Sequence, residues 1–209
     1  MLRQLMATRK YEQRLRAQSA DDTRRRILDA VYERLRDAPS QTVSVDRVAR
    51  MAGVARSTVY LVFGSRAGLF DAVGRDVMER SGYAGLIQAV GHPDAREHLR
   101  GGIAAGARMF AAERDVARAL YSMAQLDQEA VGGAIARIES ERSNGMLRLA
   151  RRLEEQGLLR DDVTVEDAAS TLWVLTSFDA FDLLFTGRGL SLEETTRLLV
   201  AAAERALLR

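Results

Sequence analysis

The stretch from Ser44 to Gly68 constrains the fold more than any other part of the chain, because helix signals there are interrupted by a sharp turn. Ser44 can start a helix, since its hydroxyl can accept a hydrogen bond from a free backbone N–H group. Apolar residues then recur at the spacing of one helix face: Val45, Val48, Ala49 and Ala52. Gly53 permits a turn with positive φ, and Ser65 can cap a further helix. The stretch therefore predicts two short helices around a tight turn, followed by a third helix.

The second short helix, about residues 55–63, has an inner and an outer face. Val59 and Phe63 continue the apolar face toward the core. The outward positions carry Arg56, Ser57, Thr58, Tyr60 and Leu61. A cation, hydroxyls, a phenol and an apolar contact are the groups that read base edges and hold phosphates in a DNA major groove. On spacing alone, an ordinary helical hairpin with a solvated face explains the pattern equally well.

The residue identities around the turn favour the first interpretation. The segment AGVARSTVYLVFGSRAGLF resembles the DNA-binding signature of TetR-type transcriptional regulators, and the matching features are Ala52-Gly53-Val54, Thr58-Val59-Tyr60, Phe63, Ser65-Arg66 and Leu69-Phe70. With the preceding helix, the resemblance covers about residues 23–77. It implies an all-α protein of about nine helices, with an N-terminal three-helix, helix-turn-helix DNA-binding domain and a C-terminal helical domain for ligand binding and dimerisation.

The resemblance also implies which residues contact DNA. They are Ser44, Val45, Asp46, Arg56, Ser57, Thr58, Tyr60, Leu61 and Arg66. Tyr60 matches a tyrosine that contacts phosphate. Arg66 matches a lysine at the start of the next helix, where a cation and a helix N-terminus both suit a phosphate. Three positions depart from the family pattern: Ala55 replaces a capping serine, Ser57 a glycine, and Gly68 an acidic residue.

Charge is distributed unevenly along the chain. Residues 1–80 hold 16 Lys and Arg against 10 Asp and Glu, a net charge of +6, and the remainder holds 15 against 19, a net charge of −4. The basic part is therefore the part with the helix-turn-helix, as expected of a polyanion-binding domain. We divide the chain into a basic extension (1–20), a DNA-binding domain (21–80) and an effector-binding and dimerisation domain (81–209). The extension is a frayed tail or an arm along DNA.

Composition excludes several other classes of protein. The chain has no Cys and only two His, His92 and His98. We therefore expect no disulfide framework, no metal site and no cofactor. No convincing nucleophile–base pair or carboxylate pair is present, so we expect no enzyme activity, and a helical enzyme is the less favoured alternative. With no uncharged run of about 18 residues and no apolar leader, we expect no membrane association and a cytoplasmic location.

The region after residue 83 reads as helices only. We expect them at about residues 94–112, 114–126, 128–156, 165–186 and 192–207. Several glycines lie inside the first and third of these, where each costs roughly 1 kcal/mol against alanine. They indicate either close helix crossings or a ligand cavity. The candidate effector-pocket residues are Met109, Phe110, Tyr121, Met123, Gln125, Met146, Trp173, Ser177 and Phe178. Core packing is the alternative for each of them.

The last two expected helices are apolar over much of their circumference, so a monomer would struggle to cover both. We therefore expect them to pair with a second copy, and the resemblance implies the same. The expected dimer-interface residues are Leu172, Leu175, Phe181, Leu184, Leu198 and Ala202. A two-fold dimer presents two recognition helices to a pseudo-palindromic site in double-stranded DNA.

These features predict a ligand-responsive, sequence-specific transcriptional regulator that binds DNA as a homodimer. In the main hypothesis it is a repressor, released from its operator when a small apolar or amphipathic molecule enters the C-terminal domain, with a coupling of ~1–3 kcal/mol. The alternative is a ligand-independent dimeric regulator or activator whose C-terminal domain only dimerises.

Overall fold

A computed structural model describes residues 2–39 and 41–209, with side chains described from residue 17 onward. All the secondary-structure elements of the described residues are helices. The N-terminal elements are α1 (Leu2–Asp37), α2 (Val45–Met51), α3 (Arg56–Phe63) and α4 (Arg66–Arg80). The C-terminal elements are α5 (Tyr83–Val90), α6 (Ala95–Ala112), α7 (Arg114–Leu126), η1 (Gln128–Gly132), α8 (Gly133–Glu155), α9 (Val165–Leu175), α10 (Phe178–Asp182), η2 (Leu183–Gly187) and α11 (Leu192–Leu207), of which η1 and η2 are short π-helices. The all-α class expected from the sequence is confirmed.

The helix-turn-helix forms as its local signals predict. Ser44 caps α2, its Oγ accepting from the backbone N–H of Arg47 at 3.2 Å, and Gly53 turns the chain with φ of 64°. Ser65 caps α4 in the same way, through the N–H of Gly68 at 3.0 Å. A Cβ atom on Gly68 would lie 2.2 Å from the carbonyl oxygen of Phe63. This chain therefore needs glycine at the position where the family pattern has an acidic residue.

One apolar core joins the first four helices to the start of the C-terminal region. Its fully buried members include Ile27 and Val31 of α1, Val48 of α2, Val59 of α3 and Phe70 of α4. Residues of α7, η1 and α8 belong to the same core. The helix-turn-helix region and the C-terminal helices therefore share one packed core. A shift of α7 or η1 must displace side chains of α1 and α4, because the core is closely packed.

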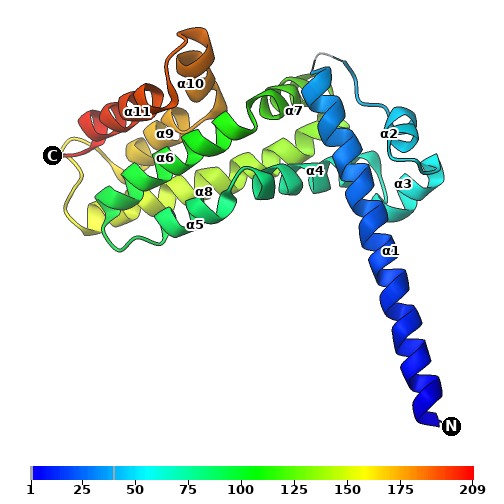
Figure 1. Cartoon of the computed structure of the whole chain (residues 1–209). Helices are drawn as coiled ribbons and strands as arrows, with labels where there is room; N and C mark the ends of the chain where they lie inside the picture. Colours follow the sequence, from blue (N-terminus) through cyan, green and yellow to red (C-terminus); the bar gives the residue numbers. More distant parts are fainter. Residues whose placement is uncertain (1, 40) are drawn as a thin grey trace.

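Helix α1 is longer than the sequence interpretation allowed. We expected residues 1–20 to form a frayed tail or an arm, whereas the backbone is helical from Leu2, and the first half of the helix projects away from the rest of the molecule (Figure 1). The segment contains no Gly or Pro and is rich in strong helix formers, which explains its continuity. The basic side chains of residues 3–16 lie outside the side chains that the structure describes, so the arm hypothesis remains a prediction.

A second core holds the far end of the molecule together. Helices α6, α8, α9 and α11 lie side by side there (Figure 1), and they bury Leu99, Leu153, Leu172 and Leu207 between them. The capping box expected of a strong helix start is present at α11, where Ser191 and Glu194 bond each other's backbone N–H groups. Helix α5 was not predicted separately. Gly82, with φ of 90°, ends the path of α4 and starts α5.

The single helix expected over residues 165–186 is wrong. The structure breaks it into α9, α10 and η2, because Ser177 caps a new helix by accepting from the N–H of Ala180 at 3.1 Å. Asp182 holds the second piece against α7 through an ion pair with Arg118 at 2.6 Å. Within the described residues, no single helix is both long and apolar enough to cross a membrane. Among these residues, only the segments Val165–Leu175 and Phe178–Gly187 taken together are long and apolar enough, and they are bent by 50° to each other.

His98 of α6 is a buried polar residue outside both candidate functional regions. Its Nδ1 faces the guanidinium of Arg152 at 2.8 Å, and Arg152 also donates to the carbonyls of His92 and Pro93. Burial, followed by the charges of Arg152 and Arg148, lowers the pKa of His98 from 6.5 to about 4. A neutral ring that accepts from Arg152 at Nδ1 therefore belongs to the folded state.

Folding stability is expected to fall between pH 6.5 and pH 4. The unfolded chain protonates His98 first, so the folded state loses its advantage as the pH drops through this window. From the two pKa values, unfolding should cost about 2 kcal/mol less at pH 5 than at pH 7.5. Urea unfolding at both pH values measures this. His98→Gln, which keeps an acceptor for Arg152, should remove most of the difference, and an unchanged difference in that variant would contradict the assignment to His98.

Candidate nucleic-acid interface and ligand cavity

Helix α3 lies on the side of the molecule away from the C-terminal bundle (Figure 1), and most of its polar side chains are exposed. Val59 is only 2% exposed and belongs to the core, whereas Leu61 is 87% exposed. Arg56, Ser57 and Tyr60 are exposed as well, and Thr58 is half-buried. The outward residues predicted from the helical period are therefore free to meet a partner.

Three of the predicted DNA contacts lie together where α2 meets α3. The Nη1 atom of Arg56 donates to Asp46 Oδ2 at 3.0 Å, and its guanidinium lies 5.7 Å from the ring centroid of Tyr60. Nη2 of Arg56 also reaches the hydroxyl of Tyr60 at 3.5 Å. The group offers an exposed cation held in a defined direction, and a phosphate can replace the Asp46 carboxylate as its partner.

The predicted contact at Val45 remains a prediction, and its side chain cannot make it. Val45 is only 7% exposed, because it starts the apolar stripe that packs α2 against the core. Only its backbone N–H, at the N-terminus of α2, can face a phosphate. Ser44, whose hydroxyl already caps α2, and Asp46 remain exposed beside it.

Arg66 points to the C-terminal region. Its Nη1 donates to the carboxylate of Asp127, its Nη2 donates to the carbonyl of Val43 at 3.3 Å, and its guanidinium lies 5.3 Å from the ring of Phe70. Asp127 also caps η1. The bond from Arg66 is the largest cause of the lowered pKa of Asp127. A phosphate contact of Arg66 therefore remains a prediction, and it requires this ion pair to open.

Helix α3, the expected recognition helix, has no capping side chain at its start, as the sequence indicated. Ala55 occupies the N-cap position of α3 with extended backbone angles and no side-chain hydrogen bond. Ala55→Ser should stabilise the fold by about 1 kcal/mol, because serine can accept from a free N–H of the first turn. Thermal unfolding should show a rise of roughly 2–4 °C. Ala136→Ser, at an exposed position in the first turn of α8, is the control and should not raise the melting temperature. An equal change in both variants would argue against the missing cap.

An apolar cavity of ≈ 80 Å³ lies between α4, α6, α7 and α8. Its walls are Gly74, Val77, Met78, Ser81, Met109, Phe110, Glu113, Ala117, Leu120, Tyr121, Ile135 and Ile138. Helix α4, which follows the recognition helix directly, forms one wall. Met109, Phe110 and Tyr121 were predicted from the sequence as pocket residues, and the structure brings them together here.

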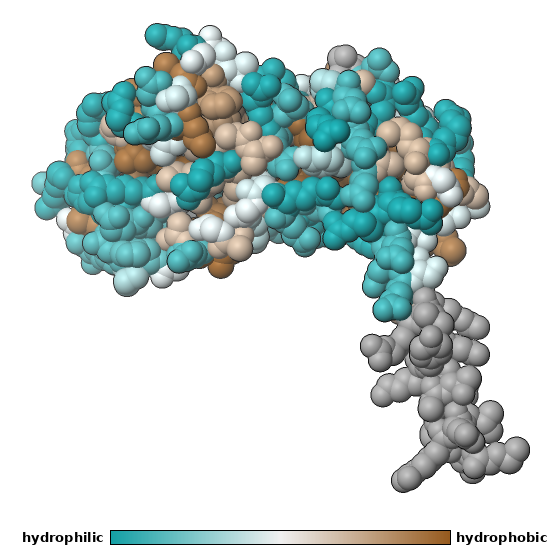
Figure 2. All heavy atoms as spheres, viewed as in Figure 1, coloured by the Kyte–Doolittle hydropathy of each residue, from teal (hydrophilic) through white to brown (hydrophobic). Residues whose placement is uncertain are grey.

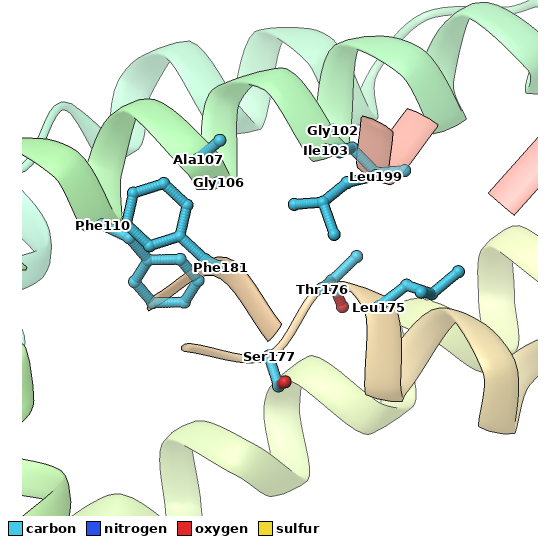
Figure 3. Close-up of a pocket in the computed structure, with 10 residues that line it drawn as sticks. All are labelled: Gly102, Ile103, Gly106, Ala107, Phe110, Leu175, Thr176, Ser177, Phe181 and Leu199. Atoms are coloured by element: carbon cyan, nitrogen blue, oxygen red, sulfur yellow. The ribbon is translucent and has the colours of Figure 1, made fainter. Parts of the chain in front are cut away.

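A second cavity, of ≈ 20 Å³, lies between α6, the α9–α10 turn and α11. Figure 3 shows Ala107 and Phe110 of α6 on one side, with Ser177 of the turn and Phe181 of α10 on the other. The rings of Phe110 and Phe181 are 5.7 Å apart. This space is close to that of one water molecule, so it is a packing defect beside the larger cavity rather than a ligand site.

The other predicted pocket residues lie elsewhere. Phe178 lines neither cavity and stands behind the larger one, stacked on Tyr121 at 5.3 Å. Met123 is buried in the first core, Gln125 is exposed, and Met146 packs on the second core. Trp173 is 42% exposed, with the guanidinium of Arg142 5.1 Å from its ring. Assigning these last four to the pocket was wrong, because aromatic and methionine content alone does not show which face of a helix meets a cavity.

Two cavity residues, Glu113 and Tyr121, have polar side chains, and only Tyr121 was predicted from the sequence. Glu113 was missed, since a carboxylate between two helices gives no sequence signal. It accepts a hydrogen bond of 2.5 Å from the hydroxyl of Tyr32 in α1. Burial, followed by this bond, raises the pKa of Tyr32 to about 12. Tyr121 donates to Glu139 at 2.6 Å, and its pKa is raised by burial first and then by that bond.

The predicted dimer-interface residues divide into two groups. Leu172 and Phe181 are 0% and 1% exposed, so they belong to the interior of one chain, and assigning them to an interface was wrong. Leu175, Leu184, Leu198 and Ala202 are half-buried. The apolar side chains that remain open on these helices are instead Trp173, Val174 and Leu183. Figure 2 shows apolar side chains on the surface around α10.

Comparison with known proteins agrees with this arrangement. Residues 27–73 match the family model for bacterial regulatory proteins of the tetR family. No curated protein sequence matches the chain.

Solved structures share the fold over most of the chain. A TetR family transcription regulator from Marinobacter aquaeolei is 21% identical with a TM-score of 0.67, covering 92% of this chain and 98% of its own. NalD of Pseudomonas aeruginosa, the secondary repressor of the MexAB-OprM multidrug efflux pump, is 23% identical with a TM-score of 0.67, covering 92% and 98%. The ketosteroid transcriptional regulator KstR2 of Mycobacterium tuberculosis is 16% identical with a TM-score of 0.64, covering 89% and 95%. With the helix-turn-helix residues in place, residues 27–73 form a DNA-binding region of the tetR family, and the chain as a whole shares the fold of solved TetR-family transcriptional regulators.

Proposed function

We propose that the protein is a dimeric repressor that leaves its operator when a small apolar or amphipathic molecule enters the ≈ 80 Å³ cavity. One observation carries the proposal: α4 both follows the recognition helix and forms a wall of the cavity. A molecule inside the cavity and a DNA duplex outside therefore act on the same helix.

The size of the cavity supports a mechanical coupling. Ligand pockets usually measure about 300–1,000 Å³, so a drug-sized ligand cannot enter this one without moving its walls. Gly74 of α4 packs closely on α8, since a Cβ there would lie 3.3 Å from Ile138. Helix α4 therefore has no room to move closer to α8. Enlarging the cavity shifts α4 outward and changes the angle at which α3 meets DNA.

Polar contacts join α1 and α4 to the C-terminal helices, and their presence or absence defines the two arrangements of the protein. Asp127 holds Arg66 at the start of α4, Arg137 of α8 pairs with Asp71 of α4, and Glu113 holds Tyr32 of α1. A ligand that disfavours this set of contacts changes operator affinity only by its differential affinity for the two arrangements, typically ~1–3 kcal/mol.

Thermal shift across a small-molecule library, followed by operator-release titration, tests the proposal. Compounds that stabilise the protein should also lower its operator affinity. Ala117→Leu, which fills the cavity, should keep operator binding and lose the response, whereas Ala136→Leu on the exposed face of α8 should keep both. Stabilising compounds that leave operator affinity unchanged would favour the alternative of a ligand-independent regulator.

A further inference from the structure

The larger cavity contains one formally charged side chain. Among its lining residues, all within the described part of the chain, only Glu113 carries a formal charge, and Ser81 and Tyr121 are the other polar side chains. Glu113 lies at the junction of α6 and α7, where it is the C-cap residue of α6 and the N-cap residue of α7. Glu113 is half-buried, and the part of its carboxylate that faces the apolar walls loses hydration unless a partner compensates its charge.

The partner that Glu113 has is neutral. It accepts from the phenol of Tyr32, and no ion pair to it is formed within residues 17–39 and 41–209. Comparable carboxylates have arginine partners: Asp127 has Arg66, Glu139 has Arg142, and Asp182 has Arg118. The Arg80 guanidinium is engaged elsewhere, by Asp29 and Asp76, and lies over the Tyr32 ring. Glu113 therefore remains able to accept a cation.

Aromatic side chains form the wall beside it. Phe110 and Tyr121 line the cavity, and Phe178 supports both, edge-on to Phe110 at 5.4 Å and stacked on Tyr121 at 5.3 Å. Aromatic rings attract organic cations through their quadrupole, most strongly where water is excluded. The same surroundings disfavour an anion, because Glu113 repels it and the described cavity wall offers no cation to it.

We infer that the effector is an organic cation with an apolar body, such as an aryl or alkyl ammonium, whose charged group binds Glu113. This rests on the proposed function, since it specifies the ligand of the same cavity. The cation competes with Tyr32 for the carboxylate. Because Tyr32 belongs to α1, loss of its bond releases the DNA-binding domain from the α6–α7 junction while the apolar body displaces α4.

The test compares a cation with a neutral molecule of the same shape, on the full chain. Benzyltrimethylammonium and neopentylbenzene differ by one charge. The wild-type protein should bind the cation about tenfold more tightly or better. Glu113→Gln keeps an acceptor for Tyr32, removes the charge, and should abolish that preference while leaving neopentylbenzene binding unchanged. Tyr32→Phe removes the competitor and should strengthen cation binding several-fold.

The outcomes separate this inference from the proposed function. Equal binding of the two probes, no loss in Glu113→Gln, or no binding of either probe overturns the cationic assignment. Operator binding is measured in the same samples without probe. If a neutral or anionic compound releases the operator, the proposed function stands and this inference fails. If the wild-type protein binds no operator, the proposed function fails whatever the probes do.

Discussion

Leu183→Glu is expected to convert the protein to monomers and to weaken operator binding by more than about 100-fold. Leu183 is 69% exposed on η2, close in sequence to Val174 and Trp173, which are 56% and 42% exposed. Burying a carboxylate against a second copy of this apolar surface leaves a charge without a partner. Each monomer then binds a half-site alone, without the gain from a linked second recognition helix.

Sedimentation and operator titration measure the two effects, and Trp173, the single tryptophan of the chain, should show emission from a more exposed indole. Ile87→Glu is a matched control, since Ile87 is 54% exposed on α5, which lies across the molecule from α10 (Figure 1). It should remain dimeric with normal affinity. A Leu183→Glu variant that stays dimeric would place the interface elsewhere.

Asp127→Asn is expected to strengthen operator binding by roughly 2–3 kcal/mol per dimer, because two arginines become available to phosphates. In the structure, Asp127 engages Arg66 at the position where the family pattern has a phosphate-binding cation. Asparagine keeps the acceptor that caps η1 at the N–H of Ala130, so the change removes charge and little else.

The salt dependence of binding separates this effect from a general rearrangement. The slope of log K against log salt should steepen by about 0.9 for each new phosphate contact. Arg66→Ala should weaken binding, and the double variant should match Arg66→Ala alone, since the gain passes through that side chain. A gain that survives in the double variant contradicts the mechanism.

The sequence predicted the DNA-binding region well because its signals are local. Ser44, Gly53 and Ser65 act on the backbone within three residues of themselves, so the caps and turn could be predicted without tertiary information. Two helices of the C-terminal region, Arg114–Leu126 and Leu192–Leu207, also begin and end where the pattern placed them.

What the sequence did not predict depends on distant contacts. The break at Ser177 was hidden, because a helix apolar on every side gives no sign of where it bends. Leu172 and Phe181 were assigned to a dimer surface for the same reason, although neighbouring helices of one chain bury them. The Tyr32–Glu113 hydrogen bond joins residues 81 positions apart, and the Arg66–Asp127 pair joins residues 61 positions apart. Nothing in the local sequence pattern links the members of either pair.

Selection of bound duplexes from random DNA tests the central claim most directly. If α3 enters the major groove as one of a symmetric pair, the selected fragments should share an inverted repeat whose half-sites are separated by about one helical turn or a multiple of it. Tyr60→Phe together with Arg66→Ala should weaken binding to all fragments alike without changing the consensus. Selection of no sequence, or of a single asymmetric site, would contradict the account.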